Sequence, residues 1–362
     1  SARYNLAAAS ARANGFVPIG PSVVANTTVS VPTPPSGYIF GGSGDGSLNP
    51  SYDQPTQRID FTNDTATALV KGSPAGGNLY SNFAVGNTNF AYVANAGDSK
   101  PAQIQRFNYE NDTLALVIKG AMNTAYTDHT GGTTTTVGGY NASATGNHDY
   151  GWINGGYKLY SVPAPNNDYY ESFSTIDRID YSNDTADTLR RSYSTNRFGS
   201  GSATGTNSYG YWIGGSTDVL SYNGTSTKVD RTDYSNDTTN AVAKGNLTTI
   251  HGRESDSIGN SSYGWVAGGR PWGSTIVDRI DYASDTSTAS PRGQLSIAMY
   301  SQSTTGNQSY GYFCGGSPGP LSSVQRVDYS NDTATASPKG PLAYKNSSSS
   351  GASTTYNSLP ST

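Results

Sequence analysis

The stretch RIDYSNDT, residues 178–185, decides the fold because the chain contains it in six variants. Each variant begins at an arginine, and the interval between arginines is 47 to 53 residues apart from one interval of 72. The six copies are RIDFTNDT at 58–65, RFNYENDT at 106–113, RIDYSNDT at 178–185, RTDYSNDT at 231–238, RIDYASDT at 279–286 and RVDYSNDT at 326–333. Self-similarity at such a period indicates one structural unit stacked repeatedly against its neighbours.

An aromatic run precedes each copy, and a Lys-Gly or Arg-Gly pair follows most copies. The aromatic runs are GYIFGG at 37–42, FAYVANAG at 90–97, YGWINGG at 150–156, YGYWIGG at 209–215, YGWVAGG at 263–269 and YGYFCGG at 310–316. Each unit then closes with a polar stretch such as LSIAMYSQSTTGN at 295–307. A unit therefore holds four short strand-like runs, which is the content of a propeller blade. We expect the aromatic run, which mostly ends at Gly-Gly, to be an inner, well-buried strand. The third and fourth runs are more polar, and we expect them to be outer strands.

The prediction is an all-β, kelch-like β-propeller of six blades, each of four antiparallel strands, with seven blades as the alternative. Residues 38–351 would form the propeller. Residues 1–37 would supply an N-terminal strand and a proline-rich linker or degenerate blade, and residues 352–362 would be a C-terminal tail. The segments SARYNLAAASARANG at 1–15 and PLAYKNSSSSGAST at 341–354 both resemble the fourth run, so both cannot close the same blade.

The composition excludes several classes of protein. Charged residues are 13% of the chain, against ~25% in typical soluble proteins, and only three residues are glutamate. Glycine (43) and tyrosine (27) are abundant instead, which argues against a mainly helical protein. A net charge of −4 offers no basic surface for nucleic acid. No apolar run of ~18 residues predicts membrane insertion, and the single Cys314 excludes a disulfide within the chain.

The repeat resembles two kinds of protein. Gly-Gly after an aromatic strand, followed by hydrophobic-Asp-Tyr and Asn-Asp-Thr, is similar to a kelch repeat, although Ala-Thr-Ala stands where kelch repeats have tryptophan. Residues 1–13, 263–295 and 310–342 more specifically resemble repeat-rich proteins of marine tailed phages, especially cyanophages. This second resemblance implies a virion structural protein of the tail, fibre or capsid, with other virion proteins as partners in a multimeric assembly.

No enzyme signature stands out. The chain contains no GxSxG, HExxH or GxxxxGK[ST] motif, and no copper-oxidase or sialidase pattern can be placed on it. His129, His148 and His251 occupy unequal positions in the repeats, so we expect solvent-facing loop residues rather than convergent metal ligands. The expectation is a protein without catalysis, metal or cofactor.

An arginine and an aspartate flank one residue in most copies of the repeat. Because these pairs recur at the same place, a ladder of ion pairs and backbone hydrogen bonds between neighbouring blades is favoured over a binding role. The aspartate of Asn-Asp-Thr is expected to be a turn former. The pairs are Arg58 with Asp60, Arg178 with Asp180, Arg231 with Asp233, Arg279 with Asp281, and Arg326 with Asp328.

Aromatic residues in the longer loops are the candidate ligand-binding residues. The loops at 43–57, 157–173 and 216–230 all follow the aromatic strand, so we expect them on one rim of the propeller. Tyrosine and tryptophan can stack on sugars or pack on a protein, and the alternative is that they cover the blade ends. The candidates are Tyr157, Tyr160, Tyr169, Tyr170, Tyr222 and Trp272.

Together these features favour a non-catalytic phage propeller on the virion surface that contributes to attachment to a host-surface glycan or protein. One alternative is a purely structural assembly protein without host contact. The other is a secreted bacterial adhesin or glycan-binding propeller.

Overall fold

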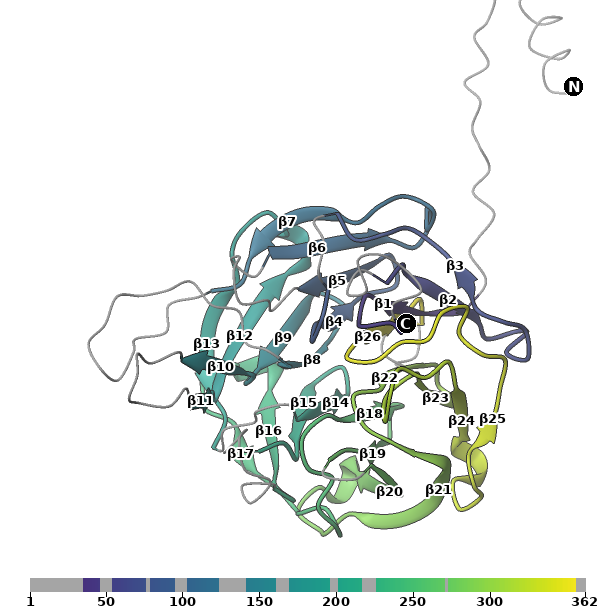
Figure 1. Cartoon of the computed structure of the whole chain (residues 1–362). Coiled ribbons are helices and arrows are strands. Elements are labelled where there is room, and N and C mark those ends of the chain that lie inside the picture. The colour runs from purple at the N-terminus through teal and green to yellow at the C-terminus, as the bar shows by residue number, and fades with distance from the viewer. Residues whose placement is uncertain are drawn as a thin grey trace, which may run out of the picture. The chain divides into compact units, whose positions relative to one another are not determined.

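The computed structural model describes residues 35–45, 54–75, 79–94, 103–123, 141–160, 169–195, 201–216, 226–270 and 273–355, with the backbone alone for 157–160 and 169–171. Residues 1–34, which contain most of the expected N-terminal strand and linker, lie outside the described residues. The described residues form six four-stranded antiparallel sheets and one two-stranded hairpin. The sheets follow one another around an axis as the blades of a β-propeller (Figure 1). The prediction of an all-β propeller with six blades is therefore confirmed.

The first two strands of each blade lie nearest the axis. The innermost strands are β26 (Ser350–Ser353), β4 (Phe83–Gly86), β8 (Ser143–Gly146), β14 (Ser202–Gly205), β18 (Ser255–Gly259) and β22 (Ser303–Gly306). The second strands are β1 (Ser36–Phe40), β5 (Phe90–Ala94), β9 (Tyr150–Asn154), β15 (Tyr209–Ile213), β19 (Tyr263–Gly268) and β23 (Tyr310–Cys314). Each innermost strand contacts the innermost strands of both neighbouring blades, which closes the ring around the axis.

The third and outer strands complete each blade. The third strands are β2 (Gln57–Asp60), β6 (Gln103–Asn108), β12 (Thr175–Asp180), β16 (Val229–Asp233), β20 (Ser274–Asp281) and β24 (Val324–Asp328). The outer strands are β3 (Leu69–Val70), β7 (Val117–Ala121), β13 (Leu189–Tyr193), β17 (Val242–Ala243), β21 (Ser290–Met299) and β25 (Ser337–Pro338). The hairpin of β10 (Tyr157–Tyr160) and β11 (Tyr169–Ser172) lies outside these sheets, between β9 and β12 in sequence.

The expectation that the polar fourth run is an outer strand is wrong, and the aromatic run, well buried as expected, is the second strand of each blade. The innermost strand comes from the polar run that precedes it, for example SATG at 143–146. Six strands converge on one axis, and mainly small side chains fit there. The aromatic strands instead lie between neighbouring blades, where both of their faces are covered and Tyr38, Trp152 and Tyr312 are fully buried.

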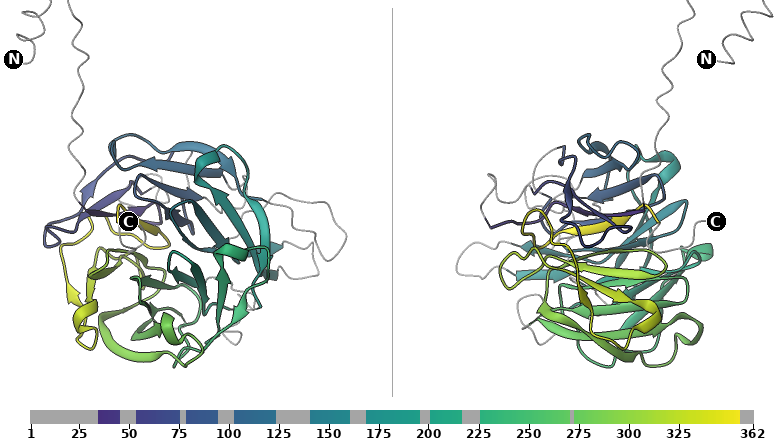
Figure 2. Two further views of the ribbon diagram at one scale, coloured as in Figure 1. Left: turned by 180° about the vertical axis from the view of Figure 1, so that it is seen from behind. Right: turned by 90° about the vertical axis from the view of Figure 1, so that its right-hand side faces the viewer.

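The first blade joins the two ends of the described chain. β26 pairs with β1, with Tyr38 opposite Ala352, so the C-terminal segment supplies the innermost strand of the first blade. Figure 2 shows this strand from two further directions. The polar run at 341–354, which resembles a fourth run, supplies a strand of the blade that begins with Ser36. The expected limits of the propeller, 38 and 351, each fall inside a strand.

Candidate functional site

A ring of six ion-pair clusters joins each blade to the next. The arginine of the third strand donates to the aspartate of Asn-Asp-Thr in the following blade over 2.7–3.0 Å. The lysine or arginine of the outer region approaches the same carboxylate over 2.7–3.5 Å. The six arginine–aspartate pairs are Arg58–Asp112, Arg106–Asp184, Arg178–Asp237, Arg231–Asp285, Arg279–Asp332 and Arg326–Asp64.

The buried aromatic residue of the second strand completes each cluster. The Trp152 indole N–H donates to Asp237 over 2.9 Å, and its ring stacks on Tyr234 with centroids 3.7 Å apart. In the last blade the Tyr312 hydroxyl donates to Asp64 over 2.9 Å. Burial alone would raise the pKa of Asp237, but hydrogen bonds from Arg191 and Trp152 and the charge of Arg178 lower it. The carboxylate therefore stays ionised, and each cluster binds two blades together.

The arginine and the aspartate of the repeated phrase have separate roles. Asp180 accepts hydrogen bonds from the Ser182 backbone N–H over 2.9 Å and from the Ser182 hydroxyl over 2.6 Å, which caps the short 3₁₀ turn Tyr181–Asn183. Arg178, two residues earlier, instead pairs with Asp237 of the next blade and lies 4.2 Å from the centre of the Tyr150 ring. The same capping contact is made by Asp60, Asp233, Asp281 and Asp328.

His251 is buried, so the expectation of a solvent-facing loop residue is wrong for it. Its Nε2 lies 3.2 Å from Asp278 and its Nδ1 lies 3.3 Å from the Gly268 carbonyl oxygen. Asp278 also accepts from the Thr248 backbone N–H over 2.9 Å, so the pair fixes the loop before β18 to the third strand of the same blade. His148 is exposed as expected, and His129 lies outside the described residues.

The candidate ligand-binding residues fall mainly on backbone that extends the third blade. Tyr160 is opposite Tyr169, and Leu159 is opposite Tyr170, in the β10–β11 hairpin. At its base, Phe173 N–H donates to the Gly156 carbonyl over 2.9 Å, and the buried Ser172 hydroxyl donates to the Ser216 carbonyl of the fourth blade over 3.1 Å. Tyr222 and Trp272 lie outside the described residues.

The loops that follow the second strands share one face of the propeller with those that enter the innermost strands. Antiparallel strands reverse direction at each step, so these two sets of connections emerge at the same end of every blade. The β10–β11 hairpin belongs to this loop face. The tight turns that follow the innermost and third strands, including the Asn-Asp-Thr turns, lie at the opposite end.

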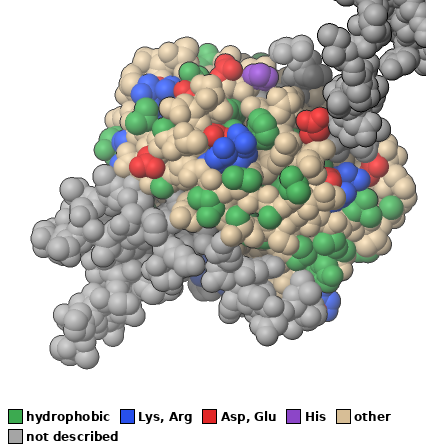
Figure 3. Space-filling model, turned by 90° about the horizontal axis from the view of Figure 1, so that it is seen from above, with side chains coloured by type: hydrophobic (Ala, Val, Ile, Leu, Met, Phe, Trp, Pro, Cys, Tyr) green, Lys and Arg blue, Asp and Glu red, His purple; other side chains and the backbone are tan. Residues whose placement is uncertain are grey.

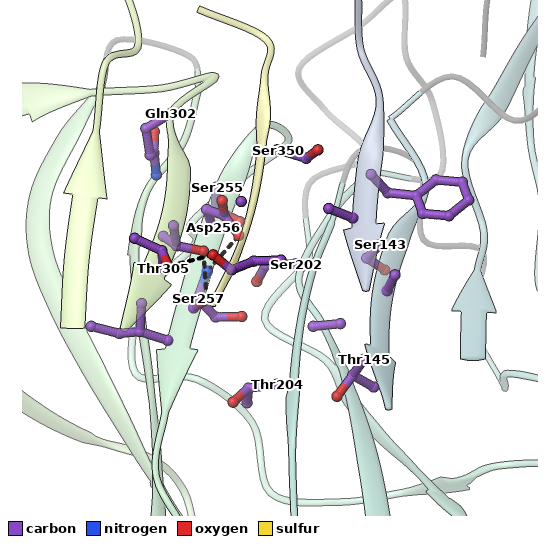
Figure 4. Close-up of a pocket in the computed structure, with 18 of the residues that line it drawn as sticks. Ser143, Thr145, Ser202, Thr204, Ser255, Asp256, Ser257, Gln302, Thr305 and Ser350 are labelled. Carbon is purple, nitrogen blue, oxygen red and sulfur yellow. Dashed lines mark hydrogen bonds between the residues drawn. The ribbon is translucent and has the colours of Figure 1, made fainter. Parts of the chain in front are cut away.

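A central channel lies between the innermost strands. Its volume is about 140 Å³, and all six innermost strands contribute to its wall. Serine and threonine side chains surround Asp256 there (Figure 4). Glu254 lies at the entrance to β18 and pairs with Arg270 over 2.8 Å. Asp256 is not among the predicted site residues, although alignment of the six polar runs shows an aspartate where four blades have serine.

Charges on the outside are mixed. On the face drawn in Figure 3, the described Lys and Arg side chains are scattered among Asp and Glu side chains. Among the described residues, no three His, Cys, Asp or Glu side chains are grouped so as to hold a metal ion. Within the same part of the chain, no helix has the length and apolar character needed to cross a bilayer.

Comparison with known proteins identifies the fold. No protein-family model matches the chain, and no curated protein matches its sequence. The solved structure of YjhT is similar, with a TM-score of 0.58 and 9% sequence identity over 75% of this chain and 87% of that chain. At this identity the likeness supports the propeller architecture and carries no function from one protein to the other.

Proposed function

We propose that this chain is a non-catalytic propeller of a tailed-phage virion, exposed on the particle surface, whose loop face contributes to attachment to a host-surface glycan or protein. Two things support the proposal. The repeated phrases resemble those of marine tailed-phage structural proteins over most of the chain. The fold supplies a closed scaffold that presents a set of loops at one end, and such loops commonly carry binding residues.

The single observation that carries the proposal is that the β10–β11 hairpin is added to a blade that is already complete. β9 and β12 pair directly, with Ile176 opposite Asn154 at the point where the hairpin departs. The third blade therefore keeps its four strands without any contribution from the hairpin. An extension that the blade does not need for its own pairing, and that holds four tyrosines, is suited to contact with a partner.

Cell binding tests this proposal. We would label the purified chain and measure its binding to cultured marine cyanobacteria by flow cytometry. A variant in which residues 158–171 are replaced by a short Gly-Ser linker keeps the two closing contacts at Gly156 and Ser172, and it should lose most of the binding. The matched control is Tyr193→Ala, which removes a half-exposed tyrosine of the same blade from the outer strand β13 and should bind normally.

Equal binding by the linker variant would contradict a role of the hairpin in attachment. Binding of the chain to many unrelated bacteria, with none to cyanobacteria, would favour the bacterial adhesin instead. In each case thermal unfolding of the variants shows whether the propeller has remained folded.

A second candidate function, assembly without host contact, is favoured by the outer strands. Five blades expose aliphatic side chains on this edge, where unpaired backbone groups can accept a further strand. The corresponding strands of the fifth and sixth blades contain Pro291 and Pro338, which block such pairing. The exposed aliphatic residues are Leu69, Val70, Val117, Ile118, Leu189, Val242 and Ile297. Loss of particle assembly on replacing Val117 and Ile118 by lysine, with cell binding unchanged, would support this candidate.

A further inference from the structure

At one position of the innermost strands four blades have a serine and two blades depart from it, and all occupants except Ser303 line the channel. The position is defined by its pairing with the last residues of the second strand. Its occupants are Phe83 opposite Ala94, Ser143 opposite Asn154, Ser202 opposite Ile213, Asp256 opposite Ala267, Ser303 opposite Cys314, and Ser350 opposite Phe40. The second and fifth blades therefore differ from the other four, and in a ring of six these two blades face each other across the axis.

Asp256 has no cationic partner in the channel. Its carboxylate accepts a hydrogen bond from the Ser257 backbone N–H over 2.8 Å. Glu254, the other acid in the wall, is already paired with Arg270. The described residues that line the channel include no lysine, arginine or histidine. Burial raises the pKa of Asp256 to about 7, while the Ser257 N–H and the Thr304 hydroxyl act in the opposite direction.

Several buried polar atoms around Asp256 have no hydrogen-bond partner within the protein. They are the hydroxyl groups of Ser202, Ser255 and Ser350 and the side-chain carbonyl oxygen of Gln302. Ser202 is 2% exposed, and Ser255 and Ser350 are each 6% exposed, yet all three line the channel. Buried polar groups are normally paired, and an unpaired group costs about 1–3 kcal/mol.

The chemistry of the wall selects the charge of the ligand. A carboxylate without a counter-ion, an amide carbonyl oxygen and serine hydroxyls together form an acceptor-rich set. An anion would meet two carboxylates and no cationic side chain. An ammonium group brings three N–H donors and a positive charge, which matches this set, and charge-assisted hydrogen bonds are the stronger kind. The cavity is about 140 Å³, roughly ten times the space of ~10–15 Å³ that one water needs.

We propose that the central channel is a binding site for a small ligand carrying a primary ammonium group, which Asp256 binds through its carboxylate. Serine and threonine residues elsewhere on the channel wall supply further acceptors. Phe83 on the opposite blade provides an apolar surface for the carbon atoms of the ligand. This site is separate from the β10–β11 hairpin and does not depend on the proposed attachment function.

Three probes of similar size and different charge test the site: ethanolamine, ethylene glycol and glycolate. Saturation-transfer NMR with the full chain should show ethanolamine bound at least about tenfold more tightly than ethylene glycol, since a charged hydrogen bond adds about one factor of ten in affinity. Glycolate should give no transfer. Ethanolamine should also lower the pKa of Asp256, followed through its ¹³C carboxyl signal.

Two variants of equal charge complete the test. Asp256→Asn should remove the preference for ethanolamine, whereas Asp281→Asn, at an exposed turn of the same blade, should retain it. Equal binding of ethanolamine and ethylene glycol would overturn the ammonium site in favour of a neutral hydroxyl ligand. Absence of transfer from all three probes, or ethanolamine binding that survives Asp256→Asn, would overturn it altogether.

Discussion

Arg326 of the sixth blade donates a hydrogen bond to Asp64 of the first blade over 2.8 Å, although 262 residues separate them in sequence. The five remaining junctions between neighbouring blades have the same arginine–aspartate contact. The junction between the last and the first blade therefore does not differ from the others in this contact. Closure also uses β26, which pairs with β1. The ring is thus closed twice, by an ion pair near the Asn-Asp-Thr turns and by backbone hydrogen bonds at the axis.

The Asp64 carboxylate should be a strong determinant of stability. Asp64→Ala leaves Arg326, Lys339 and the Tyr312 hydroxyl without their shared acceptor, and we expect a loss of about 3 kcal/mol in the free energy of unfolding. Asp60→Ala, which removes only a turn cap, should cost about 1 kcal/mol. Urea denaturation measures both, and equal losses would show that the interblade cluster contributes nothing beyond a turn.

The C-terminal strand should be required for cooperative folding. A chain ending at Ser349 lacks β26, which exposes the edge of β1 and opens the ring. We expect it to unfold at a lower temperature and to bind hydrophobic dyes. A chain ending at Thr355 retains β26 and is the matched control. Identical melting curves for the two chains would contradict the closure of the first blade by β26.

Asp256 should give the stability a distinct pH dependence. Its folded-state pKa of about 7 is above the unfolded value of ~3.9, so the native state holds more protons than the unfolded state between these values. The free energy of unfolding should therefore fall as the pH rises from about 4 to 7.

Asp256→Asn should abolish this fall and be more stable than the parent at pH 8, by up to about 4 kcal/mol. The difference between the two proteins should vanish near pH 4. Denaturation of both at a series of pH values provides the check, with Asp281→Asn as a control that keeps the parent's behaviour. A difference in the free energy of unfolding that does not change with pH would show that the pKa of the Asp256 carboxyl is not raised in the folded protein.

Trp152 should tolerate replacement by tyrosine and no smaller residue. Four blades use tyrosine in the equivalent position, where its hydroxyl reaches the same aspartate. Trp152→Tyr should cost no more than about 1.5 kcal/mol, whereas Trp152→Ala should cost about 3–5 kcal/mol through the cavity and the lost hydrogen bond. Comparable losses from both variants, measured by thermal unfolding, would refute the equivalence of the blades here.

The loop-face aromatics should matter for binding and leave folding intact. Replacement of Tyr169, Tyr170 and Trp272 by alanine should not change the melting temperature. Tyrosines at the centre of an interface often contribute 2 kcal/mol or more, so cell binding should weaken by more than about tenfold. A clear loss of thermal stability would show that these residues cover the blade ends instead.

The sequence predicted the blade count and content because the local patterns repeat. The aromatic strand, the turn after the third strand and the Lys-Gly or Arg-Gly pair recur in most blades. Each of them is a pattern of a few consecutive residues. The fourth run lies at the axis, although its polarity predicts an outer position. Hydrophobicity alone does not distinguish that position from the axis.

The interblade contacts of Asp64, Asp112 and their equivalents could not be derived locally. Their partners lie in the preceding blade, and a turn-forming aspartate has the same sequence signature as one that also binds an arginine. Asp256 was hidden for a different reason. That Asp256 departs from the repeat is evident only when the innermost strands are superposed, because four other blades have a serine at the same position.

The central claim, that the loop face is the binding surface of a virion propeller, is tested most directly by cryo-electron microscopy of the particle containing this chain. The account predicts that the loops at 43–57, 157–173 and 216–230 project into solvent at an exposed surface or fibre tip. Burial of these loops against neighbouring subunits would contradict it and leave the chain as a building block of the particle.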